Sequence, residues 1–312
     1  METKSIVCMM TIDHNNLRKL DLNLLLAFDA LMRTRSVSAA ANMLSLGQPA
    51  MSHSLRRLRD MFGDELLRRE GGQLRPTDRG LALWTPVRDA LEGLETGLDM
   101  AREFNPETAE RVFRLSLPDY LAPTVLPHLI AFALNAPGLR FRVESLARDP
   151  GRASLIDGRL DAYVGVMPAQ DMIVEEPLFE DDFVTLYDPA HWPEPPLTLS
   201  AYCDAPHLLV SQADSFEGWV DVALAKQERE RRVVGSVARF GDAIAMLPGT
   251  RLLATLSRKA AGTIGAGSGV LACPPAVGPR QLRICLYRRR RAIGAPASEW
   301  LAERIRDCLV AA

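Results

Sequence analysis

Three arginines lie within four positions of the chain and could bind the phosphates or base edges of a nucleic acid. They are Arg56, Arg57 and Arg59. A guanidinium group presents paired N–H donors that match a phosphate or the major-groove edge of guanine. The same residues could instead form an ordinary solvated helix face, which is the commoner role of a run of charges. The choice depends on the elements that position these side chains.

Residues 36–62 have the pattern of two short helices joined by a tight turn. Ser36 and Ser38 are candidate N-caps for the first helix. Leu46-Gly47-Gln48 supplies the turn, and Pro49 fits the first turn of the second helix. Four apolar residues of the second helix recur at helical spacing, namely Met51, Leu55, Leu58 and Phe62. The opposite face carries Pro49, Ser52, His53, Arg56 and Asp60. A buried stripe with a polar outer face indicates a helix-turn-helix.

A hairpin is expected directly after this pair of helices. Residues 66–69 and 73–75 flank Gly71-Gly72, a turn pair that tolerates positive φ. The hairpin would form the wing of a winged helix-turn-helix, with Arg68, Arg69 and Arg75 as basic side chains. Thr77 is expected to cap the helix that follows.

Residues 21–105 resemble the N-terminal DNA-binding module of LysR-type transcriptional regulators. The resemblance rests on DLNLL (Asp21–Leu25), SVSAAANML (Ser36–Leu44), GQPAMSHSLRRLRDMFGDELLRRE (Gly47–Glu70) and RPTDRGLAL (Arg75–Leu83). The motifs are most similar to the subgroup of nodulation and aromatic-degradation regulators. Two departures are Gly47, where the family usually has a Ser or Thr cap, and Leu67, where Phe is common.

The resemblance implies that residues 20–77 form a winged helix-turn-helix that binds double-stranded DNA at a dyad-symmetric site in a promoter. Ser52, His53 and Arg56 are expected to reach base edges, with the other residues of the set near the DNA backbone. The full set is Ser36, Ser38, Gln48, Pro49, Ser52, His53, Arg56, Arg57, Arg68, Arg69 and Arg75.

A long linker helix is predicted over residues 78–105. Apolar residues, with Gly80 before them and Ala101 after them, alternate at spacings of four and three, as in a short coiled coil. The positions expected to dimerise are Trp84, Val87, Leu91, Leu94 and Leu98. The alternative is an amphipathic helix that packs on its own domain. The resemblance implies antiparallel pairing of two linker helices in a homodimer, and a homotetramer of two such dimers.

From Arg111 onward strands alternate with helices, which predicts an α/β fold with parallel sheets. The resemblance implies that residues 106–312 form an effector-binding domain similar to periplasmic binding proteins, with two α/β subdomains. The crossovers are placed near Asp181–Asp182 and Ala272–Pro275. Subdomain I would then be residues 111–181 and 273–312, and subdomain II residues 182–272.

In open α/β folds a ligand binds at the carboxyl ends of the strands, in the cleft between subdomains. The side chains expected there are Pro118, Asp119, Tyr120, Met167, Ser211, Gln212, Phe240 and Thr255. Each of them taken alone is as well explained by packing or capping, and Asp119 in particular could cap its own helix. A small-molecule effector is expected, and its identity does not follow from the sequence.

Composition bounds the remaining possibilities. The net charge of −2 hides an asymmetry, because residues 1–80 carry 12 Lys and Arg against 9 Asp and Glu. A basic N-terminal region joined to an acidic remainder suits a protein that binds phosphate through its N-terminal region alone. The sequence has no apolar run long enough for a membrane span, no signal peptide and no nucleotide-binding, hydrolase or metal-ligand motif. We therefore predict a cytoplasmic regulator, not an enzyme, with no cofactor or metal.

Alternatives remain within and outside this class. The regulator could be independent of any effector, or could respond to thiol oxidation through Cys273 and Cys285. A more distant alternative is a solute-binding protein, which the absence of a signal peptide and the presence of the winged module argue against. RNA polymerase is a further expected partner. Residues 1–19 are interpreted as a tail without assigned function.

Overall fold

The computed structural model describes residues 21–70, 73–100, 103–168, 170–195, 198–213 and 215–310. The chain divides into two compact units, one up to residue 98 and one from residue 99 onward, and each is described by itself. The predicted tail of residues 1–19, the Gly71-Gly72 turn and the end of the linker seam at Ala101 lie outside the described residues.

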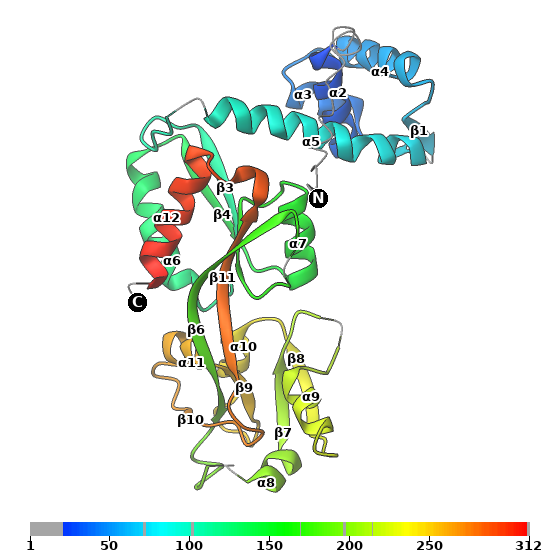
Figure 1. The fold of residues 1–312 in the computed structure, drawn as a ribbon. Coiled ribbons are helices and arrows are strands. Elements are labelled where there is room, and N and C mark those ends of the chain that lie inside the picture. The colour runs from blue at the N-terminus through cyan, green and yellow to red at the C-terminus, as the bar shows by residue number, and fades with distance from the viewer. Residues whose placement is uncertain are drawn as a thin grey trace, which may run out of the picture. The chain divides into compact units, whose positions relative to one another are not determined.

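The first unit contains a trihelical core and a hairpin, followed by a long helix (Figure 1). Its elements are α2 (Leu22–Thr34), α3 (Val37–Met43), α4 (Gln48–Phe62), β1 (Leu67–Glu70), β2 (Gln73–Pro76) and α5 (Asp78–Met100). Side-chain caps define their starts: Asp21 accepts from the Asn23 amide at 3.0 Å, and Ser36 accepts from the Ala39 amide at 3.3 Å. Ser38 lies inside α3 and is not a cap.

The predicted stripe of α4 forms part of the core of this unit. Met51, Leu55 and Leu58 are buried, and the Phe62 ring lies 6.1 Å from the ring of Phe28 in α2. Thr77 accepts a hydrogen bond from the Gly80 amide at 2.9 Å, as expected for a cap. Gly80 is required at the start of α5, because a Cβ there would lie 2.4 Å from the Leu66 carbonyl oxygen.

The predicted seam of α5 divides into two parts. Trp84 and Val87 pack against the core of their own unit, and Trp84 Nε1 donates to Asp29 at 2.9 Å. Leu91 is half-buried, whereas Leu94 and Leu98 are 54% and 62% exposed. The two interpretations of this helix, packing on its own domain and pairing with a second helix, therefore apply to different turns. The start of α5 packs within the domain, and its later turns leave apolar side chains exposed.

The second unit contains two α/β subdomains (Figure 1). Subdomain I has a mixed sheet in the order β6-β11-β5-β3-β4. Its elements are β3 (Arg111–Ser116), α6 (Ala122–Asn135), β4 (Leu139–Glu144), α7 (Arg148–Ile156), β5 (Ala162–Gly165), the first half of β6 (Ile173–Tyr187), β11 (Gln281–Arg289), the 3₁₀ turn Arg290–Ala292 and α12 (Pro296–Val310). The expected parallel pairing holds for β3 with β4 and β5, but β11 runs antiparallel to β5 and β6.

Subdomain II is built around the second half of β6, which pairs with β9 and β10. A parallel pair, β7 with β8, completes its strands. Its other elements are α8 (Leu199–Asp204), β7 (Pro206–Val210), α9 (Trp219–Ala225), β8 (Arg232–Val237), α10 (Phe240–Ala245), β9 (Ala254–Ser257), α11 (Arg258–Ile264) and β10 (Leu271–Cys273).

Two long antiparallel strands, β6 and β11, connect the subdomains (Figure 1). The first predicted crossover, at Asp181–Asp182, lies inside β6. The second differs from the prediction of Ala272–Pro275, because β10 pairs with the subdomain II end of β6 and Cys273 packs there against Tyr187 and Leu253. The chain returns further on, where Gln281 of β11 lies opposite Asp182. Among the described residues no helix combines the length and apolar character that a membrane crossing requires.

Candidate functional site

The outer face of α4 is open to solvent along its length. Ser52, His53 and Arg56 are all exposed, and Met51, Leu55 and Leu58 lie on the buried side. Gly47 is the N-cap and makes no side-chain capping bond, while Gln48 and Pro49 at the helix start are exposed. Uncapped amides at a helix N-terminus favour a bound anion such as phosphate. The face therefore combines a possible backbone anchor with side chains that can reach base edges.

The arginines of α4 have three different environments. Arg56 has no hydrogen-bond or ion-pair partner within the described part of the chain. Arg57 forms a 3.2 Å ion pair with Asp21. Arg59 bonds to the carbonyls of Glu65 at 2.9 Å and Leu67 at 2.6 Å, so it fastens α4 to the wing. Of the three, Arg56 is the one with its donors free.

The arginines of the wing also differ in whether they have a carboxylate partner. Arg68 and Arg75 both approach Glu70, at 2.7 and 3.8 Å, whereas Arg69 is exposed and, among the residues described, has no carboxylate partner. Ser38 is exposed on α3, and the hydroxyl of Ser36 is engaged in capping. The predicted DNA-binding residues are thus gathered on α3, α4 and the wing of one unit, but four of them already have partners in the protein.

A cavity of about 730 Å³ lies between the two subdomains. The carboxyl ends of β3, β4 and β5 line it on one side, and the residues after β7 and at the start of α10 line it on the other. Leu282 and Ile284 of β11 contribute to its wall. This is the position expected for a ligand in an open α/β fold.

Five of the eight predicted cleft residues line this cavity: Pro118, Tyr120, Ser211, Gln212 and Phe240. Three do not. Asp119 bonds to backbone amides of α10, and the Met167 backbone exchanges hydrogen bonds with the Tyr287 hydroxyl. Thr255 bonds to Thr185 and to the Tyr202 hydroxyl inside subdomain II. Asp119 and Met167 follow the ends of β3 and β5, whereas Thr255 lies within β9, and all three have side chains or backbones committed to contacts away from the cavity.

The sequence interpretation missed several lining residues, of which Ser145, Arg148 and Tyr163 are the polar ones of most interest. Ser145 and Arg148 follow β4, so the strand-end rule applied to that strand would have found them. Tyr163 lies within β5 and packs against Gly151 of α7, where a Cβ would meet the ring at 2.5 Å. That close approach brings the start of α7 to the cavity wall.

One side chain of the cavity lining connects the two subdomains. Gln212 Nε2 donates to the Ser145 carbonyl at 3.2 Å and lies 3.1 Å from its hydroxyl. Arg148 adds a cation to the same wall, and its Nε donates to the Val166 carbonyl. The cavity therefore combines aromatic and aliphatic walls with a few polar groups, which is typical of small-molecule sites.

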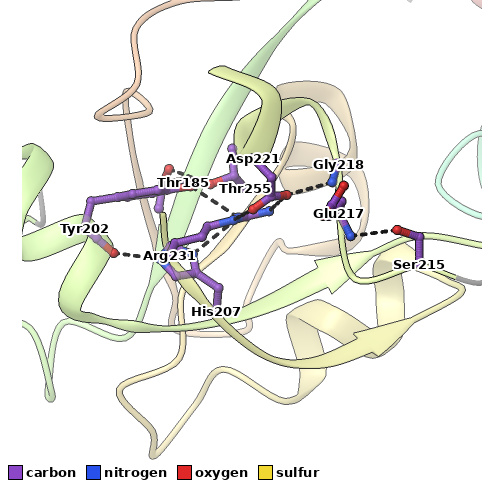
Figure 2. Close-up of polar contacts among 9 residues, drawn as sticks. All are labelled: Thr185, Tyr202, His207, Ser215, Glu217, Gly218, Asp221, Arg231 and Thr255. Carbon is purple, nitrogen blue, oxygen red and sulfur yellow. Dashed lines mark hydrogen bonds and ion pairs between the residues drawn. The ribbon is translucent and has the colours of Figure 1, made fainter. Parts of the chain in front are cut away.

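Subdomain II contains a polar network that includes the cavity-lining residue Gly218 (Figure 2). The Gly218 amide, at the cavity, donates to Asp221 at 2.7 Å, and Asp221 receives two hydrogen bonds from Arg231 at 2.8 and 2.9 Å. Burial raises the pKa of Asp221, but these hydrogen bonds and the Arg231 charge outweigh it and bring the pKa below its usual value. The network holds the cavity wall from within.

His207 lies at the inner end of this network and is fully buried. Its Nε2 lies 2.7 Å from the Tyr202 carbonyl, which can only accept, so Nε2 carries the proton and Nδ1 faces Arg231 at 3.5 Å. Burial lowers the pKa of His207 to about 4, and the neighbouring Arg231 charge acts in the same direction. The imidazole is therefore neutral near pH 7.

The features that supported alternative functions have structural roles. Burial raises the pKa of both Cys273 and Cys285 to about 11, which disfavours the thiolate needed for oxidation chemistry. Arg288, the first of four consecutive arginines (Arg288–Arg291) that could suggest a second basic patch, is buried against Glu176 and Glu299. Within the described ranges no group of His, Cys, Asp and Glu is placed to hold a metal ion.

Comparisons with known proteins match both units. Residues 22–81 match the family described as bacterial regulatory helix-turn-helix protein, lysR family, and residues 106–309 match the LysR substrate binding domain. Nodulation protein D 1 of Sinorhizobium fredii (strain NBRC 101917 / NGR234) is 35% identical over 245 residues, which cover 76% of this chain and 74% of that protein. The HTH-type transcriptional activator NahR of Pseudomonas putida is 31% identical over 297 residues, covering 93% and 98%. The crystal structure of a probable transcriptional regulator from Pseudomonas aeruginosa is similar with a TM-score of 0.65 and 31% identity, covering 94% and 99%.

Proposed function

The chain belongs to the LysR family of bacterial regulatory helix-turn-helix proteins, and from this premise we propose how its two sites divide the work of regulation. It is a DNA-binding transcriptional regulator with an effector-binding domain, and not an enzyme. The proposal concerns which residues read DNA, where the effector binds and how copies of the chain assemble.

We propose that α4 enters the major groove and that Ser52, His53 and Arg56 contact base edges. Arg56 is best suited to bidentate recognition of guanine, because it is exposed and its donors have no partner in the described part of the chain. Gln48, Pro49 and the uncapped start of α4 lie against one phosphate, and Arg69 against another. Arg57, Arg68 and Arg75 give up their ion pairs with protein carboxylates and bind DNA phosphates instead. Ser36 and Ser38 lie near the DNA backbone.

The effector of this proposal is a small molecule bound in the cavity between the subdomains. Tyr120 and Phe240 supply aromatic walls, and Ser211, Gln212, Ser145 and Arg148 supply polar contacts. A ligand that binds one arrangement of the two subdomains better than another shifts the equilibrium between the two arrangements. The coupling free energy is about 1–3 kcal/mol in typical cases.

Assembly is proposed to use α5. Leu94 and Leu98 are exposed, and a second α5 packed antiparallel would cover them together with Leu91. Such a dimer places two α4 helices on a dyad-symmetric promoter site, and two dimers form a homotetramer. RNA polymerase is the proposed partner at the promoter.

The single observation that carries the proposal for DNA is the exposed face of Ser52, His53 and Arg56, opposite the buried side chains of Met51, Leu55 and Leu58. It is tested by selecting bound sites from a random duplex library with the wild type and with Arg56→Ala. The variant should lose preference at one base position and lose about 1–3 kcal/mol for the selected site. An equal loss for all sequences would show that Arg56 contacts phosphate instead.

The effector proposal is tested by the melting temperature of the full chain against a panel of aromatic acids, phenolics and small carboxylates. A compound at 100 times its dissociation constant stabilises the folded state by about 2.7 kcal/mol. A binder should lose its effect in Phe240→Ala, and binding that survives this variant places the compound elsewhere. A panel without binders, together with intact DNA selection, favours the effector-independent alternative.

A further inference from the structure

Tyr163 lines the cavity, and its hydroxyl has no hydrogen-bond partner among the described residues. The residue is 7% exposed, so more than nine-tenths of its surface is buried. By contrast, the hydroxyl of the neighbouring Tyr287 donates to the Met167 carbonyl at 3.0 Å. The Tyr163 hydroxyl is not one of the fully enclosed polar atoms without a partner in the described structure, so its oxygen remains accessible. It is therefore a donor open to the cavity, for which the described part of the protein supplies no acceptor.

Two glycines hold the Tyr163 ring in this position. A Cβ at Gly151 of α7 would lie 2.5 Å from the ring. A Cβ at Gly165, the last residue of β5, would lie 2.9 Å from the ring and 3.3 Å from the hydroxyl oxygen. A side chain at either position would displace the tyrosine. A buried hydroxyl without an acceptor is unfavourable, so a fixed hydroxyl of this kind points to a ligand group that accepts its hydrogen bond.

A positive charge and a helix N-terminus adjoin this hydroxyl. Arg148 begins the nine-residue helix α7 and lines the cavity, and its Nε donates to the Val166 carbonyl at 3.2 Å. Its other two guanidinium nitrogens have no partner among the described residues. The N-cap of α7, Ala147, makes no side-chain capping bond. Burial raises the pKa of Tyr163, and the Arg148 charge acts in the opposite direction, so the two groups are close and the hydroxyl keeps its proton at pH 7.

Two carboxylates also line the cavity, but neither one occupies the Arg148 guanidinium. Asp149 pairs with Arg152 at 3.0 Å. Glu217 is exposed and precedes α9 in subdomain II. The charge that acts on the Tyr163 hydroxyl is that of Arg148. This part of the wall therefore presents hydrogen-bond donors and one positive charge.

We propose that Tyr163, Arg148 and the start of α7 form a subsite for a carboxylate of the effector. The phenol and the guanidinium donate hydrogen bonds to the anion, and a helix N-terminus without a side-chain cap favours the same charge. One cation balances one negative charge, so a carboxylate suits the subsite better than a phosphate dianion. Tyr120, Phe240 and Ile284 line the same cavity, so the rest of the effector is apolar. This inference rests on the proposed function of the cavity as the effector site.

The unpartnered donor is tested first, by the melting temperature of the full chain without ligand. Tyr163→Phe removes only the hydroxyl, and because this hydroxyl bonds to no described residue, the melting temperature should stay the same or rise. Tyr287→Phe is the matched control. It removes a hydroxyl that exchanges hydrogen bonds of 2.9 and 3.0 Å with the Met167 backbone, so the melting temperature should fall. An equal fall in both variants would show that the Tyr163 hydroxyl is structural, which overturns the proposal.

Recognition is tested next with benzoate and benzamide, two probes of the same shape that differ in charge. Calorimetry with the full chain should show that the wild type binds benzoate at least about tenfold more tightly. Arg148→Met should abolish this preference, and Tyr163→Phe should weaken benzoate binding by about tenfold. Arg148→Lys keeps the charge without the paired donors, should retain part of the preference, and serves as the test if Arg148→Met does not fold. Arg159→Met, an exposed arginine that pairs with Asp157 at 3.2 Å, is the matched control and should behave as the wild type.

Each outcome supports or overturns the subsite. A wild type that binds both probes equally, or binds neither, overturns it, as does a preference for benzoate that survives in both Arg148→Met and Tyr163→Phe. A loss in Arg148→Met alone overturns the role of Tyr163. The effector proposal is judged separately by Phe240→Ala. A panel binder that needs Phe240 but is unaffected by Arg148→Met and Tyr163→Phe would keep the cavity as the effector site and overturn the carboxylate subsite.

Discussion

Arg231 in subdomain II and Arg56 on α4 carry the same guanidinium group in opposite settings. The Arg231 side chain is 2% exposed, and it bonds to Asp221, Tyr202 and His207 (Figure 2). Arg56 is exposed, and among the described residues its donors have no partner. A buried charge is tolerated only with its partners, so removing one partner costs stability. An exposed free charge contributes little to stability and is available for a ligand.

The comparison separates residues that hold a site in place from residues that act in it. In subdomain II the polar groups are interior and shape the cavity wall through the Gly218 amide. On α4 and the wing the polar groups face solvent, and a buried apolar stripe positions them. The expected effects of substitution therefore differ in kind: loss of folding stability in one region, and loss of DNA affinity without loss of stability in the other.

The largest effect is expected for Asp221→Ala. It leaves the guanidinium of Arg231 buried without its carboxylate, which typically costs about 3–5 kcal/mol. The free energy of unfolding from urea titration measures this loss. Asp204→Ala, an exposed carboxylate whose only described side-chain bond is from Ser200 at 3.4 Å, should change it by less than about 0.5 kcal/mol.

A double variant sharpens this test. Replacing both partners with apolar residues, as Arg231→Met with Asp221→Leu, should recover much of the stability, because no uncompensated charge remains. If Asp221→Ala instead unfolds no more easily than Asp204→Ala, the network does not hold the subdomain and the contrast with α4 fails.

The pH dependence of stability should be the next largest effect. His207 has a folded pKa of about 4 against about 6.5 when unfolded. Because the unfolded state binds the proton first, the stability present above pH 6.5 is lost as the pH falls toward 4. At pH 5 the expected loss is about 2 kcal/mol. His207→Gln should flatten the unfolding free energy between pH 6.5 and 5, a range in which the network carboxylates stay ionised.

An exposed histidine provides the control for this measurement. His53→Gln, on the exposed α4 face, controls for the loss of a histidine elsewhere in the chain. An equal slope in the wild type and in His207→Gln would mean that the buried imidazole is already protonated or hydrated, contrary to its hydrogen bonds.

A smaller effect is expected at the wing. Arg69→Ala should weaken binding to every DNA sequence alike and reduce the slope of log affinity against log salt concentration by about 1. Fluorescence anisotropy at several salt concentrations measures both. Arg142→Ala, an exposed arginine of the effector domain, is the matched control and should leave the slope as it is. A loss confined to one sequence would make Arg69 a base reader.

The DNA-binding unit was predictable because its signals are local. The caps at Asp21, Ser36 and Thr77 bond within three residues along the chain, and one helix carries both the buried stripe and the exposed face. The strand-end rule likewise found Tyr120 and Phe240 in the cavity wall. Periodicity and capping are properties of a few consecutive residues, so the sequence displays them directly.

The rest of the fold and of the cavity depends on contacts between residues that are distant in the sequence. Asp119 was expected in the cleft, but its partners lie more than 120 positions away, and no local pattern encodes that pairing. Strand β6 spans 15 residues, but its first half contains Glu175, Glu176 and Pro177, which are unfavourable in strands, so its full length does not follow from local composition. The partners of Arg57 and of Arg75 were invisible for the same reason: ion pairs between residues on different elements follow from the fold.

Those unforeseen ion pairs give the smallest expected effect. Glu70 pairs with Arg68 at 2.7 Å and approaches Arg75 at 3.8 Å, and all three side chains are exposed. An exposed ion pair is worth about 0.2–1 kcal/mol, so Glu70→Gln should leave stability nearly unchanged. The two freed arginines should bind phosphate, raising affinity for any DNA by a similar amount and steepening the salt slope. Glu65→Gln, two residues before β1, is the control, since in the described structure its backbone carbonyl, and not its carboxylate, bonds to Arg59. Unchanged affinity in Glu70→Gln would place Arg68 and Arg75 away from the DNA and leave Arg69 as the wing's contact. A gain limited to one sequence would mean that the Glu70 carboxylate discriminates between bases. The wing would then contribute to sequence recognition together with α4.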